Sequence, residues 1–338
     1  MMAKRQKVFL VGYGEISRKQ HLPMIESLDM LELAAIVDPV LVNETGPSGK
    51  VNIYPNLEEA FLATNTTKEA DGSIVVITCP PEFAQDYAAQ ALSSGSSVFM
   101  EKPPGFDCQR LTHLEDIARK LELTLFTGYH SAYSPQMNNA KAWISNHKPL
   151  QKILVTWNES IRRWHPNFEH SWIIDGKFGV LDILFNPMTM IDELLGAGSL
   201  SKFELDRNKS SLVIPKNWNG PISGATTLTS SGSQKCDIIA NFTWDLPDNE
   251  QDVWAITFES YSGQKMELRD GGGTLFIDGV DVERGLACDI DILRPEYERL
   301  YHRFVELMNS KACEVRTSPL RVMLSIIESS KNIVGQHY

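Results

Sequence analysis

The chain has 338 residues, of which 42% are hydrophobic and 22% charged, a composition typical of globular proteins that excludes a disordered or collagen-like chain. Its length fits two domains of about 100–200 residues each. The formal net charge of −11, from 32 Lys and Arg against 43 Asp and Glu, argues against a nucleic-acid or anionic-membrane partner.

The sequence has no segment typical of membrane insertion or secretion. Its apolar runs stay short of the ~18 residues that span a bilayer, and Gly12, Gly14 and Glu15 end the first run too early for a signal peptide. Five scattered cysteines without a CxxC pair are typical of a reducing compartment. We therefore expect a cytoplasmic enzyme with neither membrane nor nucleic acid among its partners.

Strands and helices alternate in the first half of the chain. Such alternation is typical of parallel βαβ units, so we expect residues 1–128 to form a doubly wound parallel sheet. Short apolar and β-branched runs predict strands at residues 8–11, 31–37, 74–78, 98–100 and 124–127.

The second half, residues 129–338, has a different pattern. Between about residues 202 and 278, strand-like runs follow one another without helices, which predicts a large, mostly antiparallel sheet in an α+β domain. For the last helix, packing back on the first domain is an alternative that the sequence leaves open. The expected helices cover residues 134–146, 179–195, 295–308 and 318–334, and a further strand covers residues 152–160.

A glycine-rich turn directly follows the first predicted strand. It reads Gly12-Tyr13-Gly14-Glu15-Ile16-Ser17, with serine where a third glycine is usual. The first glycine allows a tight turn, the second lets the backbone approach a pyrophosphate, and the following helix offers N–H groups to the anion. This strand–turn–helix context favours a dinucleotide site over a purely structural turn.

Asp38 ends the second predicted strand, 21 residues after Ser17. A carboxylate at this place accepts hydrogen bonds from the adenosine ribose hydroxyls of NAD and repels the 2′-phosphate of NADP. The following residues, Pro39-Val40-Leu41, include no arginine. We therefore predict NAD as the preferred cofactor; the alternative is a solvent-exposed turn aspartate.

Two further strand ends are expected at the cofactor, because ligands of doubly wound sheets lie at the carboxyl ends of the strands. One is Thr78-Cys79-Pro80 and the next is Glu101-Lys102-Pro103. Lys102 is the charged side chain expected in the cleft, where its ammonium group would orient the reacting oxygen and lower the pKa of that oxygen. A surface lysine is the alternative. No motif places a base beside Cys79, so a nucleophilic role for it is not expected.

Taken together, these motifs resemble the glucose–fructose oxidoreductase/inositol dehydrogenase (Gfo/Idh/MocA) superfamily over essentially the whole chain. The resemblance implies an NAD(P)-binding Rossmann domain in residues 1–128 and a substrate-binding and oligomerisation domain in residues 129–338. The open sheet of the second domain would form the contact of a homodimer or larger oligomer. Lys102 matches the lysine of the family's Glu-Lys-Pro motif, which contacts the nicotinamide ribose and the substrate.

A closer resemblance is to bacterial L-arabinose/D-galactose 1-dehydrogenases, which oxidise the C1 hydroxyl of an aldopyranose to the lactone with NAD(P). The matching strings include Glu101-Lys102-Pro103-Pro104-Gly105, Arg162-Arg163-Trp164-His165-Pro166, His21-Leu22-Pro23 and Gly179-Val180-Leu181-Asp182. Carried over by motif, the resemblance implies a pocket of Lys102, His130, Glu159, Trp164, Asp182, Asn186 and Trp254.

Asp182 and Asn186 are spaced i,i+4 on one expected helix, so both side chains face the same side. Many superfamily members carry histidine where Asn186 stands, and an amide cannot titrate. The C1 hydroxyl proton would then pass to Asp182 or to water, while Lys102 and Asn186 orient the oxygen.

Trp164 and Trp254 are expected against the apolar face of a pyranose, although a tryptophan is more often a core residue. His165 and His170 bracket Glu169, but this spacing matches no familiar metal motif and hydride transfer to NAD needs no metal, so none is expected.

We therefore expect an NAD-dependent dehydrogenase for the C1 hydroxyl of an aldopyranose sugar. Two alternatives stay open: a dehydrogenase of another polyol such as an inositol, and a sensor that binds dinucleotide and sugar without turnover. The presence of Lys102 and Asp182 favours catalysis over sensing.

Overall fold

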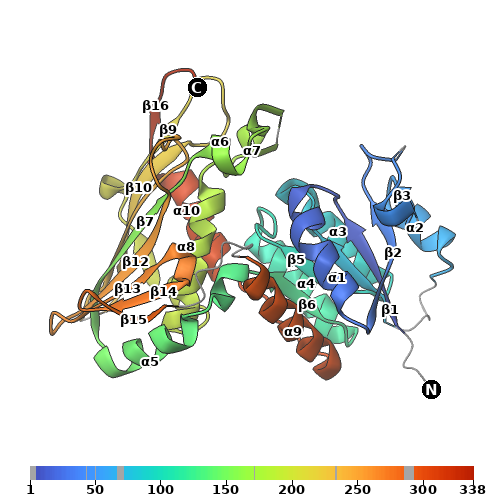
Figure 1. Ribbon diagram of the computed structural model, residues 1–338, viewed down its shortest axis with the longest axis horizontal. Coiled ribbons are helices and arrows are strands. Elements are labelled where there is room, and N and C mark those ends of the chain that lie inside the picture. The colour runs from blue at the N-terminus through green and yellow to red at the C-terminus, as the bar shows by residue number, and fades with distance from the viewer. Residues whose placement is uncertain are drawn as a thin grey trace. The chain divides into compact units, whose positions relative to one another are not determined.

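The structure is a computed structural model that describes residues 5–42, 44–49, 51–66, 72–170, 172–232, 234–284 and 293–338. None of the helices in these ranges combines the length and hydropathy that a membrane crossing requires. The chain divides into two compact units (Figure 1). The first comprises Met1–Tyr129 and Leu293–Thr317, and the second comprises His130–Ile292 and Ser318–Tyr338.

The first unit is built on a six-stranded sheet in which every strand pair is parallel. Its strands are β1 (Gln6–Val11), β2 (Leu31–Val37), β3 (Ile53–Tyr54), β4 (Ile74–Ile77), β5 (Ser97–Glu101) and β6 (Leu125–Gly128). The order β3-β2-β1-β4-β5-β6 is that of a Rossmann fold, so the predicted doubly wound sheet is confirmed.

The helices of the first unit pack around this sheet. They are α1 (Leu22–Ser27), preceded by a π-helical turn Ser17–His21, α2 (Leu57–Ala63), α3 (Pro81–Ser93), α4 (Cys108–Lys120) and α9 (Arg294–Ser310). Residues 8–11 and 74–77 of the central strands are buried without interruption. Helix cover on both faces of a parallel sheet explains these continuous apolar runs.

The second unit contains a ten-stranded sheet in the order β15-β14-β13-β12-β7-β11-β10-β9-β16, with β8 paired to β10. Only the pairs β7–β11 and β9–β16 are parallel, so the predicted large, mostly antiparallel sheet is confirmed. The strands are β7 (Leu150–Asn158), β8 (Phe203–Leu205), β9 (Ser211–Ile214), β10 (Ser223–Ser230), β11 (Asp237–Thr243), β12 (Val253–Ser260), β13 (Lys265–Arg269), β14 (Thr274–Ile277), β15 (Val280–Arg284) and β16 (Lys331–Val334).

A central helix covers one face of this larger sheet. The helices of the unit are α5 (Met137–His147), α6 (Ile161–Trp164), α7 (Trp172–Asp175), α8 (Leu181–Leu195) and α10 (Ser318–Ser329). Figure 1 shows α8 along one face of the sheet, and α8 also contacts α5 and α10. Along β7, Ile153, Val155 and Trp157 are buried, whereas Leu154 between them is exposed, as strand alternation requires.

The end of the chain departs from the expected closing helix over residues 318–334. Helix α10 stops at Ser329, and Lys331–Val334 forms β16, parallel to β9. Serine is a mediocre helix former, and the β-branched pair Ile333-Val334 fits an edge strand whose backbone bonds to β9. The helix that returns to the first unit is α9, whereas α10 packs on α8 within the second unit.

Candidate active site

The two glycines of the turn after β1 have opposite surroundings. Gly12 has a φ of +87°, and a Cβ there would lie 2.8 Å from the backbone nitrogen of Cys79, so only glycine fits. A Cβ on Gly14 would meet nothing within 4 Å. The backbone of Gly14 therefore borders open space just before Glu15 and Ile16 begin the next helix. A pyrophosphate needs this combination of an accessible backbone and helix N–H groups.

Ser17 takes the place of the usual third glycine and joins the glycine turn to the turn after β4. Its buried hydroxyl lies 2.8 Å from the carbonyl oxygen of Gly12 and 2.6 Å from Thr78 Oγ1. Thr78 Oγ1 in turn lies 2.9 Å from the carbonyl oxygen of Val11. Since glycine has no hydroxyl, serine here fixes the two turns together in a way that the usual motif does not.

Asp38 follows β2 with its carboxylate held beside the glycine turn. Oδ2 accepts a hydrogen bond from the Tyr13 N–H at 2.9 Å, and Oδ1 accepts one from the Val40 N–H at 3.0 Å. The Arg18 guanidinium lies 4.5 Å from the centre of the Tyr13 ring and donates to the Tyr13 carbonyl at 3.0 Å. The turn and the carboxylate thus have the arrangement that an adenosine ribose and a pyrophosphate require.

Cys79 lies at the same turn, between Thr78 and Pro80, the residue that caps α3. Burial raises the pKa of the Cys79 thiol to about 12. At neutral pH such a thiol is protonated, which makes it a poor nucleophile. What this turn offers a cofactor is therefore its shape and its backbone groups.

The carboxylate of Glu101, at the end of β5, is buried among protein donors. Oε1 accepts hydrogen bonds from His21 Nε2 at 3.0 Å and from the Tyr297 hydroxyl, and Oε2 accepts one from the Lys102 N–H at 2.7 Å. Lys102 is half-buried and precedes Pro103 through a cis peptide bond. The predicted contact of Glu101 with the cofactor stays a prediction, while its observed role is to hold the backbone of Lys102.

The second unit positions Asp182 and Asn186 on α8. Gly179 has a φ of +50°, and a Cβ there would lie 2.3 Å from the Pro221 carbonyl oxygen. Because glycine permits this approach, the Val180 N–H donates to that same oxygen at 2.7 Å and the start of α8 is fixed. Asp182 lies in the first turn of α8 with 9% of its surface exposed, and half-buried Asn186 lies one turn later.

His130 lies on an element that contacts this helix. It is buried in the short 3₁₀ helix His130–Tyr133, which packs on α8. His130 Nδ1 lies 3.3 Å from the Ser131 hydroxyl. The structure therefore brings the elements carrying His130, Asp182 and Asn186 together in the second unit, whereas the predicted cofactor residues and Lys102 belong to the first.

Glu159, Trp164 and Trp254 also gather in the second unit, through direct contacts. Trp254 Nε1 donates to Glu159 Oε2 at 3.0 Å, and the rings of Trp164 and Trp254 lie 5.2 Å apart at an interplanar angle of 53°. Glu159 Oε1 accepts a second hydrogen bond, from Trp244 Nε1 at 3.0 Å. Sequence reasoning missed Trp244 and also Asp252, whose Oδ2 accepts from Trp164 Nε1 at 2.8 Å. The only signal for Asp252 is its place two residues before Trp254.

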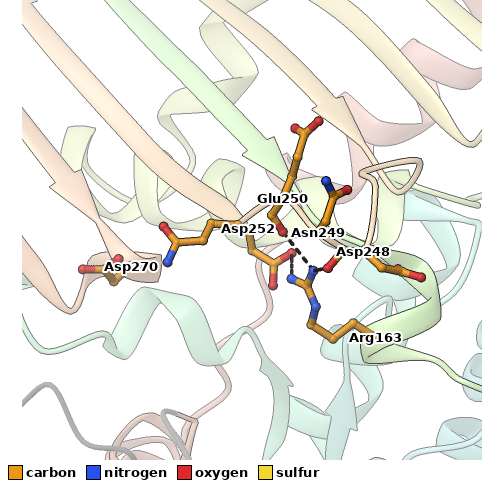
Figure 2. Close-up of a pocket in the computed structure, with 7 residues that line it drawn as sticks. Arg163, Asp248, Asn249, Glu250, Asp252 and Asp270 are labelled. Carbon is orange, nitrogen blue, oxygen red and sulfur yellow. Dashed lines mark hydrogen bonds and ion pairs between the residues drawn. The ribbon is translucent and has the colours of Figure 1, made fainter.

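A hollow of about 500 Å³ borders this cluster (Figure 2). Its lining is Arg163, Asp248, Asn249, Glu250, Gln251, Asp252 and Asp270. Sugar and dinucleotide sites usually combine aromatic walls with a few polar groups. This lining is entirely polar and contains none of the residues predicted for cofactor or substrate, so we assign neither ligand to it. Among the described residues, no three or more side chains of the metal-binding types His, Cys, Asp and Glu lie together in an arrangement that could hold a metal ion.

Comparisons with known proteins agree with this geometry. Residues 6–129 match the sequence model of the Gfo/Idh/MocA oxidoreductase family with an NAD-binding Rossmann fold. The galactose 1-dehydrogenase of Pseudomonas fluorescens is 27% identical over 317 residues, which cover 93% of this chain and 92% of that protein.

Solved structures extend the likeness to both units. The D-galactose-1-dehydrogenase of Rhizobium etli superposes with a TM-score of 0.81 at 28% identity, covering 100% of this chain and 99% of that one. The 3-ketoreductase KijD10 of Actinomadura kijaniata, solved with NADP and TDP-benzene, has a TM-score of 0.76 at 14% identity, covering 98% of this chain and 100% of that one, and shows the fold alone. The resemblance inferred from the motifs is confirmed: residues 6–129 match the Gfo/Idh/MocA oxidoreductase family with its NAD-binding Rossmann fold, and the chain is similar to galactose 1-dehydrogenases over both units.

Proposed function

We propose that the protein is an aldose 1-dehydrogenase that oxidises the C1 hydroxyl of a D-galactose- or L-arabinose-type pyranose to the lactone, with NAD preferred over NADP. The observation that carries the proposal is the similarity to galactose 1-dehydrogenases over 93% and 100% of the chain. Because that similarity includes both units, it extends to the half that would bind the sugar as well as to the cofactor half.

The first unit would hold the dinucleotide through backbone groups. The open space beside Gly14 would receive the pyrophosphate, with N–H groups from the helix that begins at Glu15. Asp38 would accept hydrogen bonds from the adenosine ribose, and its charge would disfavour a 2′-phosphate. In a chain with a net charge of −11, backbone N–H groups at a helix end hold the phosphates without a basic surface.

The chemistry at C1 needs a hydride acceptor and a proton acceptor. Bound NAD would supply the first, as the acceptor of the hydride from C1. As the C1–H bond breaks, the proton of O1 passes to the Asp182 carboxylate or to water, and the C1–O1 bond becomes the lactone carbonyl. The Lys102 ammonium and the Asn186 amide would orient O1 and stabilise its developing negative charge.

A spectrophotometric assay of NADH formation tests the proposal. The panel is galactose, arabinose, xylose, glucose, fucose and inositol, each with NAD and then with NADP. We expect turnover with the first two sugars and a higher kcat/KM with NAD. Turnover of inositol alone would identify a polyol dehydrogenase instead. Tight NAD binding without turnover of any sugar would identify a sensor.

The proposal also includes a second copy of the chain on the open face of the larger sheet. Leu154 is 38% exposed there, and across the neighbouring strands it is paired with Thr257 and Ile239. The next row places Lys152 between Glu259 and Asp237, charges that a second copy could match. Light scattering should give a mass of at least twice that of one chain, and Leu154→Lys should lower that mass. A monomeric wild-type protein would contradict this part.

We propose the cytoplasm as the place of action. Cys79, Cys236 and Cys313 are free thiols, the state that a reducing compartment maintains. Fractionation of the source cells with a galactose-dependent NADH assay tests this assignment, and activity confined to a secreted fraction would contradict it.

A further inference from the structure

Two carboxylates of the second unit bind three indole N–H groups. Glu159 accepts hydrogen bonds from Trp244 and Trp254, each at 3.0 Å, and Asp252 accepts one from Trp164 at 2.8 Å. We propose that Glu159 and Asp252 are positioning residues for sugar binding, which hold Trp254 and Trp164 as a preformed aromatic surface for the C–H face of the pyranose. This inference rests on the proposed function.

The inner half of the cluster is anchored in the core. Trp244 is fully buried, and Glu159 has 6% of its surface exposed. One oxygen of Glu159 accepts from the buried Trp244 ring, so the other oxygen sets the direction of the Trp254 indole. Trp157 is also buried and stacks on Trp254 with ring centres 6.4 Å apart. Trp254 is thus held at its N–H group and along one side of its ring.

Trp164 and Asp252 form the outer half of the cluster, where an ion pair fixes the Asp252 carboxylate. Asp252 Oδ1 lies 2.7 Å from Arg163 Nη1 and accepts the Ser160 N–H at 3.2 Å. Figure 2 shows the Arg163 guanidinium facing the Asp252 carboxylate, while it also donates to the carbonyl oxygens of Asp248 and Glu250 at 3.0 and 2.9 Å. Asp252 Oδ2 is left to accept from Trp164, which is 39% exposed. The exposed Trp164 ring is therefore held by a hydrogen bond to the Arg163–Asp252 ion pair.

The geometry of the two rings suits a sugar. Their centres lie 5.2 Å apart at 53°, which makes an angled pair rather than a flat stack. An indole has one polar atom, and with that N–H group on a carboxylate the remaining surface of the ring is apolar. A side chain already held in its bound orientation loses little rotamer freedom when the ligand arrives. Such positioning strengthens sugar binding without acting on the reacting atoms, so it should change KM for the sugar rather than kcat.

Substitution of Asp252 tests the inference. In Asp252→Ala we expect the KM for galactose to rise about tenfold, as for the loss of a hydrogen bond to a charged group, while kcat and the KM for NAD stay within about twofold. Glu250→Gln is the matched control, because it also removes one negative charge from the same turn. The carboxylate of Glu250 points away from Arg163 (Figure 2). The control should behave as the wild type.

A double-mutant cycle with Trp164→Phe isolates the indole contact. Phenylalanine keeps a ring but donates no hydrogen bond, so the KM for galactose should rise, and Asp252→Ala should add less than about twofold in that background. If the fold-changes in KM caused by Asp252→Ala and Trp164→Phe simply multiply in the double variant, the inference is overturned. If the Asp252 variants do not fold, Trp164→Phe alone decides, because it leaves the ion pair intact, and an unchanged KM would overturn the inference. A wild-type protein that oxidises no sugar would instead overturn the proposed function.

Discussion

Glu101 and His21 lie 80 residues apart in the chain and share a hydrogen bond of 3.0 Å inside the first unit. The hydroxyl of Tyr297 donates to the same carboxylate oxygen, and the N–H of Lys102 donates to the other at 2.7 Å. His21 Nδ1 lies 2.9 Å from the Tyr301 hydroxyl. The π-helical turn, α9 and the backbone of Lys102 therefore meet at one buried carboxylate.

Tyr297→Phe should destabilise the protein. Burial, together with the charge of Glu101, raises the pKa of the Tyr297 hydroxyl well above its usual value, so it remains a neutral donor. Its removal leaves Glu101 with one donor fewer, and we expect the free energy of unfolding to fall by about 1–3 kcal/mol in urea titrations. Tyr261→Phe is the control: this tyrosine is 47% exposed and its hydroxyl donates to the Lys235 carbonyl oxygen at 2.7 Å, a bond that water can replace at the surface, so a loss of about 0.5 kcal/mol or less is expected. Equal losses in both variants would contradict the importance of this network.

Asp182 and Asp192 lie on the same helix but should act differently. Asp182→Asn should lower kcat by about 10²–10⁴-fold, with NAD still bound, because a neutral amide takes no proton. Asp192 is fully buried and accepts hydrogen bonds from the N–H groups of Gly198 and Leu200 and from the Ser318 hydroxyl, each at 2.9 Å. Asp192→Asn should lower the thermal unfolding temperature and leave kcat near normal. Near-normal turnover in Asp182→Asn would refute its assignment as the base.

The parts of the fold that local pattern encodes could be predicted from the sequence. The apolar run of β1, the glycine turn after it and the alternation of strands and helices in the first half of the chain predicted the parallel sheet that the structure shows. The pairing of β16 with β9 joins residues more than a hundred positions apart and has no local signal. The same is true of α9, whose buried face includes Tyr297 and Tyr301 and packs in the first unit, whereas the chain segments before and after it belong to the second.

Motifs identified candidate site residues but not the directions in which their side chains point. Glu159 was expected at the sugar, and in the structure both its oxygens accept indole N–H groups. Asp252 belongs to no motif, because its role depends on Trp164 and Arg163 from a distant segment. Hydrogen bonds between segments distant in the chain follow from tertiary packing, which periodicity and spacing do not encode.

Asp38→Ser should weaken the preference for NAD. The carboxylate is fixed by the N–H groups of Tyr13 and Val40, at 2.9 and 3.0 Å, so its charge has a defined place beside the proposed ribose site. Removal of that charge removes the repulsion of a 2′-phosphate, so kcat/KM with NADP should rise relative to that with NAD by about tenfold or more. The measurement is the ratio of the two values at saturating sugar. A wild-type enzyme that already prefers NADP would show that Asp38 has another role.

Cys79 should be inert toward alkylating agents. With its pKa raised to about 12 by burial, the thiol is almost entirely protonated at pH 8. Mass spectrometry after iodoacetamide treatment of the native protein should find Cys79 unmodified, and Cys79→Ala should retain turnover. Rapid alkylation of Cys79, with loss of activity, would contradict both the buried thiol and its passive role.

Glu314 should contribute to stability in a pH-dependent way. Burial alone would raise the pKa of Glu314, but the charges and hydrogen bonds of Arg316 and Arg303 outweigh it, so the pKa is lowered. A carboxyl whose folded pKa is depressed stabilises the protein above its unfolded pKa of about 4.3 and loses that contribution as the pH falls through the folded value. Glu314→Gln should therefore be less stable than the wild type at pH 7, and the difference should shrink toward pH 3. Urea titrations between pH 3 and pH 7 measure it, and a difference that stays constant with pH would mean that the two arginines do not act through the charge of Glu314.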